Sequence, residues 1–163
     1  MIALQITHVK DFMSQLLLQD TFDHFLVSEA SVTTFASFSI DGRVHPDFYG
    51  EEEAQALKHQ GRTQVLWKDI RPFCYSIIKG RRPPLSFQFV FQLPHQELDL
   101  LLERSGLSFD PENIFGLFFN CKYQQGSLTV TTGSSLKVFT MDRSLDQAWD
   151  RMLQDFLHRL NLD

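Results

Sequence analysis

Several features that would place the protein in a class at once are missing from its sequence. The chain has two cysteines, Cys74 and Cys121, but no Cys-x-x-Cys pair, which argues against a cysteine-based metal site. No run of about 18 apolar residues occurs, so no transmembrane helix is expected. The N-terminus lacks the apolar segment of a secretory signal. We therefore expect a cytoplasmic protein whose two thiols are free and buried.

Catalytic and cofactor-binding motifs are missing as well. The chain has no Gly-x-Ser-x-Gly elbow and no phosphate-binding loop of the Gly-x-x-x-x-Gly-Lys-Ser/Thr type. His95-Gln96-Glu97 matches the His-x-Glu of zinc deaminases, but the Pro-Cys-x-x-Cys that accompanies it there is absent. We therefore expect no cofactor and no bound metal.

Hydrophobic residues, in contrast, are plentiful. They make up 43% of the 163 residues, and sixteen of them are Phe. At this length roughly 70% of the surface of the unfolded chain can be buried. One aromatic-rich core can therefore stabilise the whole chain, and we expect a single domain spanning residues 1–163.

The spacing of these hydrophobic residues predicts both strands and helices. Apolar and polar residues alternate in 32–40, 85–93 and 115–123, and the Asp41-Gly42 pair after the first of these predicts a hairpin turn. Residues 127–133 and 135–140 predict two further strands. Helical periodicity covers residues 9–17, 70–77, 94–105 and 144–160. The combination predicts an α+β fold of antiparallel-rich sheets with helices.

The order of these elements suggests an internal duplication. Residues 1–80 and 84–163 each read as β-α-β-β-β-α, and each half holds one of the two tryptophans. Each half also carries Val-Thr-Thr in a middle strand, at Val32 and at Val130. We therefore expect two similar halves that share one system of sheets.

Positive charge is concentrated in one region of a chain whose net charge is −5. Residues 68–82 hold five cations and one acid, and the cations are Lys68, Arg71, Lys79, Arg81 and Arg82. Lysine and arginine side chains pair with phosphates, so these five residues are the candidate anion-binding or nucleic-acid-binding site. The alternative is local, because cations near the end of a helix complement its dipole and Pro83-Pro84 starts the next strand. Lys68 and Arg71 lie at the opposite end of the predicted helix, roughly 15 Å from the other three cations, so the five need not form one patch.

Two other sets of residues lead to different functions. A pair of strands could bring together His24, Glu29, Asp41 and His45, which predicts an enzyme with a site assembled across strands. The segment 115–123 has one fully apolar face, which is either covered by a second layer or forms an interface in a homo-oligomer. We favour a non-enzymatic intracellular module that binds itself or a protein partner, with weak nucleic-acid or anion binding through residues 68–82 and enzyme activity as the alternatives.

Five segments together resemble an uncharacterised bacterial family that is defined only as a domain of unknown function. They are DTFDHFLVSEASVTTF, SIDGR, LWKDIRPFCYSIIKG, PLSFQFVFQL and TVTTGSSLK, and they span nearly the whole chain. This resemblance implies no activity and no catalytic residues. In topology alone, the paired β-α-β-β-β units are similar to one domain of the DNA sliding clamps. The helices that face DNA in clamps are basic, whereas the two corresponding helices here are acidic on balance.

Overall fold

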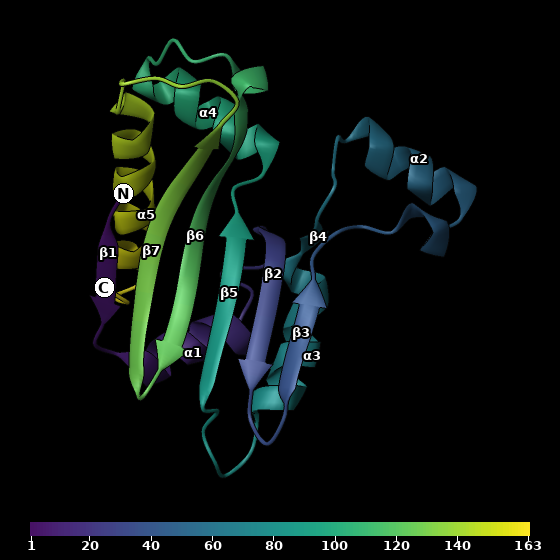
Figure 1. Cartoon of the computed structure of the whole chain (residues 1–163), viewed down its shortest axis with the longest axis vertical. Helices are drawn as coiled ribbons and strands as arrows, with labels where there is room; N and C mark the ends of the chain where they lie inside the picture. The colour runs from purple at the N-terminus through teal and green to yellow at the C-terminus, as the bar shows by residue number, and fades with distance from the viewer.

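The computed structural model describes all 163 residues and contains five α-helices and one seven-stranded sheet (Figure 1). The strands are β1 (Ala3–Ile6), β2 (Leu26–Thr33), β3 (Ser37–Asp41), β4 (Val65–Leu66), β5 (Ser86–Gln92), β6 (Ile114–Gln124) and β7 (Ser127–Leu136). The helices are α1 (Val9–Leu17), α2 (Glu51–His59), α3 (Trp67–Ile78), α4 (His95–Ser105) and α5 (Ser144–Arg159). These elements confirm the predicted α+β class.

The sheet has the strand order β1-β7-β6-β5-β2-β3, and β4 also pairs with β2. Every pairing is antiparallel. The two halves of the chain do not pair in the same way. β5 pairs with β6 of its own half, whereas β1 pairs with β7 of the other half. The structure therefore does not confirm the predicted duplication.

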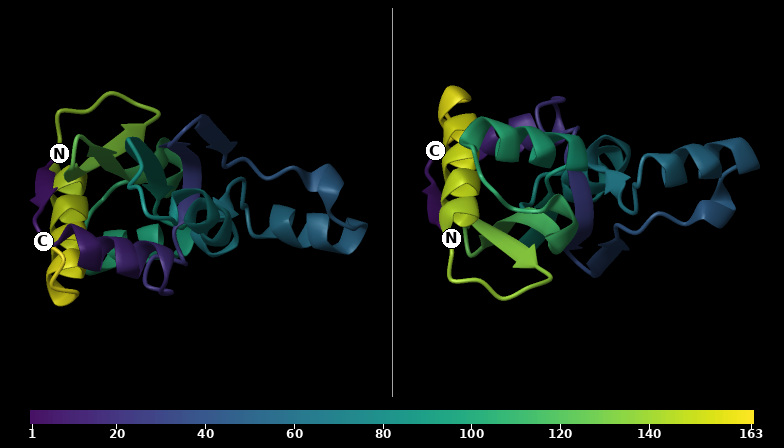
Figure 2. Two further views of the ribbon diagram at one scale, coloured as in Figure 1. Left: turned by 90° about the horizontal axis from the view of Figure 1, so that it is seen from below. Right: turned by 90° about the horizontal axis from the view of Figure 1, so that it is seen from above.

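Helices α1, α3 and α5 lie behind the sheet in Figure 1, and the end views in Figure 2 show the same one-sided arrangement. The alternation along β5 explains this arrangement, because Phe87, Phe89 and Phe91 are buried whereas Ser86 and Gln88 are only partly covered. An antiparallel sheet can leave one polar face in water. Leu117, Phe119 and Cys121 of β6 are buried under this helical layer. Phe115, which was predicted on the same face, is 57% exposed, and the register of β6 shifts between Ile114 and Gly116.

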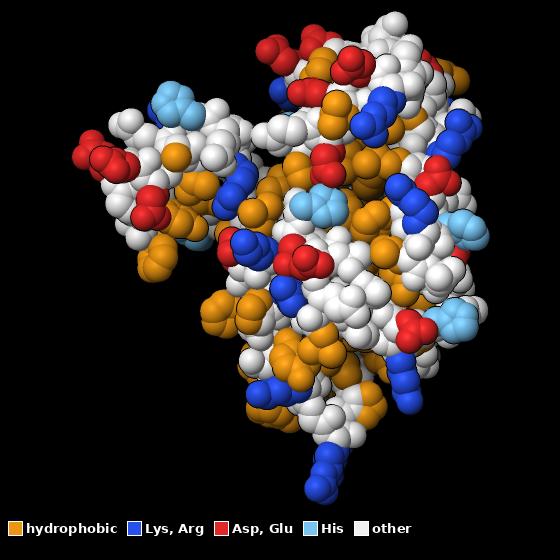
Figure 3. Space-filling model, turned by 180° about the vertical axis from the view of Figure 1, so that it is seen from behind, with side chains coloured by type: hydrophobic (Ala, Val, Ile, Leu, Met, Phe, Trp, Pro, Cys, Tyr) orange, Lys and Arg blue, Asp and Glu red, His pale blue; other side chains and the backbone are white.

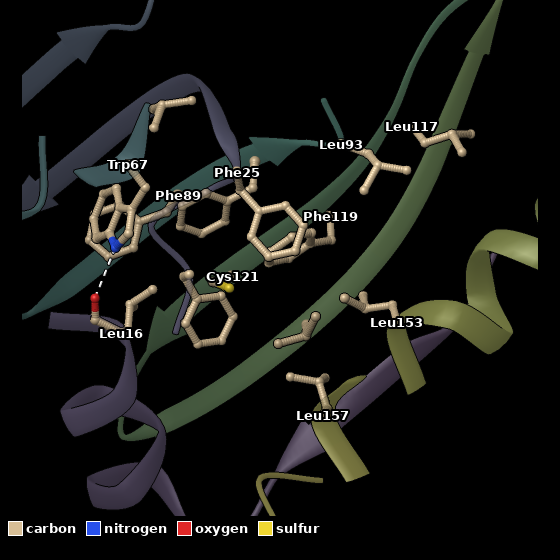
Figure 4. Packing of buried hydrophobic residues seen from close by; sticks show 14 of the residues in the cluster. Leu16, Phe25, Trp67, Phe89, Leu93, Leu117, Phe119, Cys121, Leu153 and Leu157 are labelled. Carbon is tan, nitrogen blue, oxygen red and sulfur yellow. Dashed lines mark hydrogen bonds between the residues drawn. The ribbon is translucent and has the colours of Figure 1, made fainter. Parts of the chain in front are cut away.

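Aromatic rings fill the space between the sheet and the helices (Figure 4). The ring centroids of Phe91 and Phe119 are 4.8 Å apart, and those of Trp67 and Phe91 are 5.1 Å apart. Both tryptophans also tie elements together through their indole N–H groups. Trp67 donates to the carbonyl of Leu16 at 2.8 Å, and Trp149 donates to the carbonyl of Phe118 at 2.8 Å.

The predicted hairpin at Asp41-Gly42 is wrong. The turn between β2 and β3 lies instead at residues 34–36, where the N–H of Thr34 donates to the carbonyl of Ala36 at 2.9 Å. Val32 and Phe38 are direct partners across this turn and therefore face the same side. The alternation consequently continues through the turn without a break, and Phe35 at the tip is 94% exposed.

The predicted separate strand at residues 135–140 is wrong as well. β7 runs without interruption to Leu136 and pairs with β6 along its whole length. Val138 and Phe139 lie beyond it in a loop and are exposed. The Gly133-Ser134-Ser135 segment, which is typical of a turn, stays extended because the long strand β6 supplies hydrogen-bonding partners for it.

Between β3 and β4 the chain leaves the sheet and forms a projection, which we call the arm (residues 43–64). A bridge between Arg43 and Gln64 closes its base, and it holds a 3-10 turn (Pro46–Phe48) and α2. Figures 1 and 2 show it extending away from the body of the molecule. No residue of the arm is buried.

Candidate functional site

The five cations predicted as a binding site lie at two ends of one helix. Lys68 and Arg71 belong to the first turns of α3, whereas Lys79, Arg81 and Arg82 follow its last residue, Ile78. A helix rises about 1.5 Å per residue, so roughly 15 Å separates the two groups. The structure therefore divides the basic region into two parts with different surroundings.

Arg71 is engaged in a structural ion pair. Its Nε and Nη2 atoms donate to the two carboxylate oxygens of Asp23 at 2.8 and 2.9 Å, and both side chains are largely buried. Such a bidentate ion pair fixes the relative orientation of the guanidinium and the carboxylate. Arg71 thus joins α3 to the segment after α1, and its charge is compensated within the protein.

Arg81 and Arg82 of the second group line a groove, which we call the basic groove, whereas Lys79 is not among its lining residues. The groove has a volume of about 590 Å³ and lies between α1, the end of α3, the 79–84 loop and the adjacent ends of β5 and β6. Its apolar lining consists of Val9, Met13, Leu17, Leu18, Tyr75, Ile78, Pro83, Pro84, Phe87 and Tyr123. Leu18 is 57% exposed, so this lining is in part open to a ligand.

The charges around the basic groove have one sign. Lys10, Arg81 and Arg82 line it, and no Asp or Glu side chain does. None of these three cations forms an ion pair within the chain. Three uncompensated positive charges beside an apolar lining stand out in a chain with a net charge of −5.

The local sequence explains how the two arginines reach the groove. Gly80 has φ of 143°, a backbone conformation that other residues rarely adopt, so the chain can change direction directly after α3. Pro83 and Pro84 then favour an extended backbone up to β5. A flexible turn followed by a stiff segment therefore carries Arg81 and Arg82 along the edge of the groove.

Residues 15–163 match a family described as "Family of unknown function (DUF5721)". The chain belongs to this family. No curated protein and no solved structure matches it. The match confirms the resemblance to an uncharacterised domain family, and the topological similarity to sliding clamps is not confirmed.

In this DUF5721 member, the residues of the predicted strand-assembled enzyme site are only partly brought together. Glu29 and Asp41 are direct partners on β2 and β3. His45 lies in the arm. His24 packs on the ring of Phe25, and its Nε2 atom lies 3.5 Å from a carboxylate oxygen of Glu97.

Asp41 is one of the four residues of that predicted site, and its carboxylate is stabilised in the ionised form. The backbone N–H of Arg43 donates to its carboxylate at 2.9 Å, and this bond, aided by the charge of Arg43, lowers the pKa of Asp41. A carboxylate with a lowered pKa is a weaker general base at neutral pH.

The structure contains no group of three His, Cys, Asp or Glu side chains that could hold a metal ion. None of its helices combines the length and the apolar character that a membrane-spanning helix needs.

Both cysteines are free and buried, as the sequence predicted. Burial raises the pKa of Cys74 to about 12 and also raises the pKa of Cys121, because the apolar surroundings disfavour the charged thiolate. At about pH 8 the native protein should therefore react with a thiol reagent at least roughly 100-fold more slowly than the unfolded chain. The measurement is the rate of thiol modification with and without denaturant, and rapid labelling of the native protein would contradict the burial of both thiols.

Sequence reasoning missed the part of the basic groove that α1 and β6 supply. Lys10 lies far along the chain from Arg81 and Arg82, and Tyr123 comes from a third segment. One signal was available, since Leu18 is an apolar residue directly after the buried residue Leu17. An apolar residue on the outer side of a helix end is a weak indication of a surface for binding.

Proposed function

We propose that the protein is a non-enzymatic binding module whose basic groove receives an acidic segment of a protein partner, with at least one apolar side chain in that segment. The observation that carries this proposal is the combination of an apolar lining with Lys10, Arg81 and Arg82 and with no acid. The two free thiols support a location in the reducing cytoplasm.

The two parts of the groove supply different contributions to binding. Exposed apolar atoms, such as those of Leu18, gain free energy when a partner removes them from water. Cations at the edge of an interface contribute chiefly to specificity and to the rate of association. An acidic segment with an apolar anchor satisfies both requirements, whereas a purely polar anion would leave the lining exposed.

Nucleic acid fits the groove less well. Non-specific binding to a phosphate backbone depends on neutralising many charges along a track. Three cations in a chain with a net charge of −5 provide a short track only. Lys68 and Arg71, which would lengthen it, lie in the first turns of α3, at the other end of that helix.

A labelled short peptide that alternates Glu with Phe or Leu should bind the protein in a fluorescence anisotropy titration. The groove variant K10E/R81E/R82E should bind it at least roughly tenfold more weakly, because each substitution turns attraction into repulsion. A peptide with Lys in place of Glu and a peptide with Ser in place of the apolar residues should both bind more weakly to the native protein.

The matched control for the groove variant is R104E/R151E/R159E, which reverses three exposed arginines beside a separate groove between α4 and α5. This control should retain the affinity of the native protein. Equal binding of the peptide to all three proteins would refute the proposal. Tighter binding of labelled single-stranded DNA or RNA than of the acidic peptide, with an affinity that falls steeply with salt, would favour the nucleic-acid alternative.

A further inference from the structure

The arm carries a segment with the chemistry that the basic groove requires. Residues 46–53 read Pro-Asp-Phe-Tyr-Gly-Glu-Glu-Glu and hold four acids and no cation. Phe48 is 86% exposed, and all four acids are exposed and form no ion pair within the chain. Residues 46–53 therefore combine an exposed aromatic side chain with a concentration of negative charge.

The arm gains little stability from the rest of its own chain. α2 has nine residues, none of them buried, and an isolated helix of this length is marginal in water. The acids at its start and Lys58 and His59 at its end favour the helix through its dipole. These contributions are small, so a partner that covers the arm would stabilise it substantially.

The arm and the basic groove lie on different parts of the molecule. The arm leaves the sheet beside β3 and β4, whereas the groove lies where α1 and the 79–84 loop meet. Figure 3 shows acidic side chains at the tip of the arm and, at the lower end of the body, apolar side chains with basic ones beside them. A contact between the arm of one molecule and the basic groove of another therefore joins two unlike surfaces.

We infer that the occupant of the basic groove is residues 46–53 of a second copy of this chain. Phe48 of one copy packs against the apolar lining of the other, and Glu51, Glu52 and Glu53 face its lysine and two arginines. This inference rests on the proposed function and names the partner. The contact is small, so self-association should be weak, with dissociation in the micromolar to millimolar range.

Sedimentation of the full chain at increasing concentration tests the inference. The native protein should rise above its monomer mass of 19.0 kDa. The arm variant E51K/E52K/E53K and the groove variant K10E/R81E/R82E should each associate at least roughly tenfold more weakly. An equimolar mixture of the two variants should associate again, because each reversed surface then meets an oppositely charged one.

Two further variants separate charge-specific contact from general effects. D99K/E103K/E112K reverses three exposed acids outside the arm and should associate as the native protein does. Phe48→Ala removes an exposed ring, so the variant should fold normally and associate more weakly. Circular dichroism of every variant verifies folding.

The outcomes distinguish the inference from the function on which it rests. A native protein that stays monomeric throughout, while a labelled peptide of residues 44–55 binds the groove, overturns self-association and leaves the binding function intact. If the native protein associates but the charge reversals have no effect, or the mixture of variants fails to associate, the arm-in-groove contact is wrong. If no acidic peptide binds and the groove variant changes nothing, both ideas fail.

Discussion

Replacing Trp67 with alanine should lower the free energy of unfolding by about 3–5 kcal/mol, the largest loss we expect from any single truncation in this protein. The indole is 0% exposed and packs against Phe89 and Phe91 at centroid distances of 5.1 Å each. Its removal leaves a cavity under β5 and also leaves the carbonyl of Leu16 without its donor. Both effects act at the point where α1 meets α3.

Two matched variants separate packing from hydrogen bonding. Trp67→Phe keeps much of the apolar volume but removes the N–H, so it should cost about 1–3 kcal/mol from the unpaired carbonyl and the smaller ring. Trp149→Phe makes the same change at the second indole, which donates to Phe118, and should have a comparable effect. Urea unfolding followed by circular dichroism measures all three. A loss below about 1 kcal/mol for Trp67→Ala would show that the indole does not hold the two helices together.

Gly42→Ala should destabilise the protein by about 2–4 kcal/mol, because the added methyl group collides with the backbone of β2. A Cβ at Gly42 would overlap the carbonyl oxygen of Val27 and lie 2.6 Å from its carbonyl carbon. Gly42 sits beside the irregularity in β2 between Val27 and Glu29, where its N–H donates to the carbonyl of Ser28 at 3.1 Å. The backbone of β2 cannot retreat, because β5 is paired to its other side.

The matched control is Gly133→Ala, at a glycine within β7 where an added Cβ meets nothing within 4 Å. That change should alter stability by no more than about 0.5 kcal/mol. Hydrogen exchange gives a second measurement, since the N–H of Val65 donates to the carbonyl of Gly42 at 2.8 Å. Gly42→Ala should therefore speed exchange at Val65 more than at the centre of β5. Equal stability of the two alanine variants would show that the close approach can relax.

Gly42 also has a consequence for the arm. The residue directly precedes Arg43, which pairs with Gln64 to close the base of the arm. The tight fit of Gly42 against β2 therefore sets where the arm leaves the sheet. The Asp41-Gly42 pair was predicted to form a hairpin turn, but it lies instead where the chain leaves β3 and enters the arm.

Much of the architecture could be predicted from local patterns. The α+β class and the helices that begin at Val9 and Ser144 follow from the spacing of apolar residues. This spacing can be read from residues that are close to one another in the sequence. The burial of both cysteines follows from their apolar contexts. The hairpin at residues 34–36 could not be predicted in this way, because its strand partners keep the same alternation on both sides of the turn.

The candidate binding site depends on contacts that no local pattern contains. The sequence placed five cations in one stretch and predicted that a helix separates Lys68 and Arg71 from the other three, as α3 does. The pairing of Arg71 with Asp23 was not predicted. Lys10, which no pattern connected with the others, lies beside Arg81 and Arg82 because α1 packs next to the end of α3.

By itself, then, the sequence determined the fold class, the aromatic core, the free thiols and the presence of a basic region in an acidic chain. Only the tertiary structure decided which cations share a surface, which apolar residues remain open beside them, and that an acidic segment projects on an arm. The physical reason is that composition and periodicity act over a few residues. The grouping of distant side chains, in contrast, is set by strand pairing and by the packing of helices on the sheet.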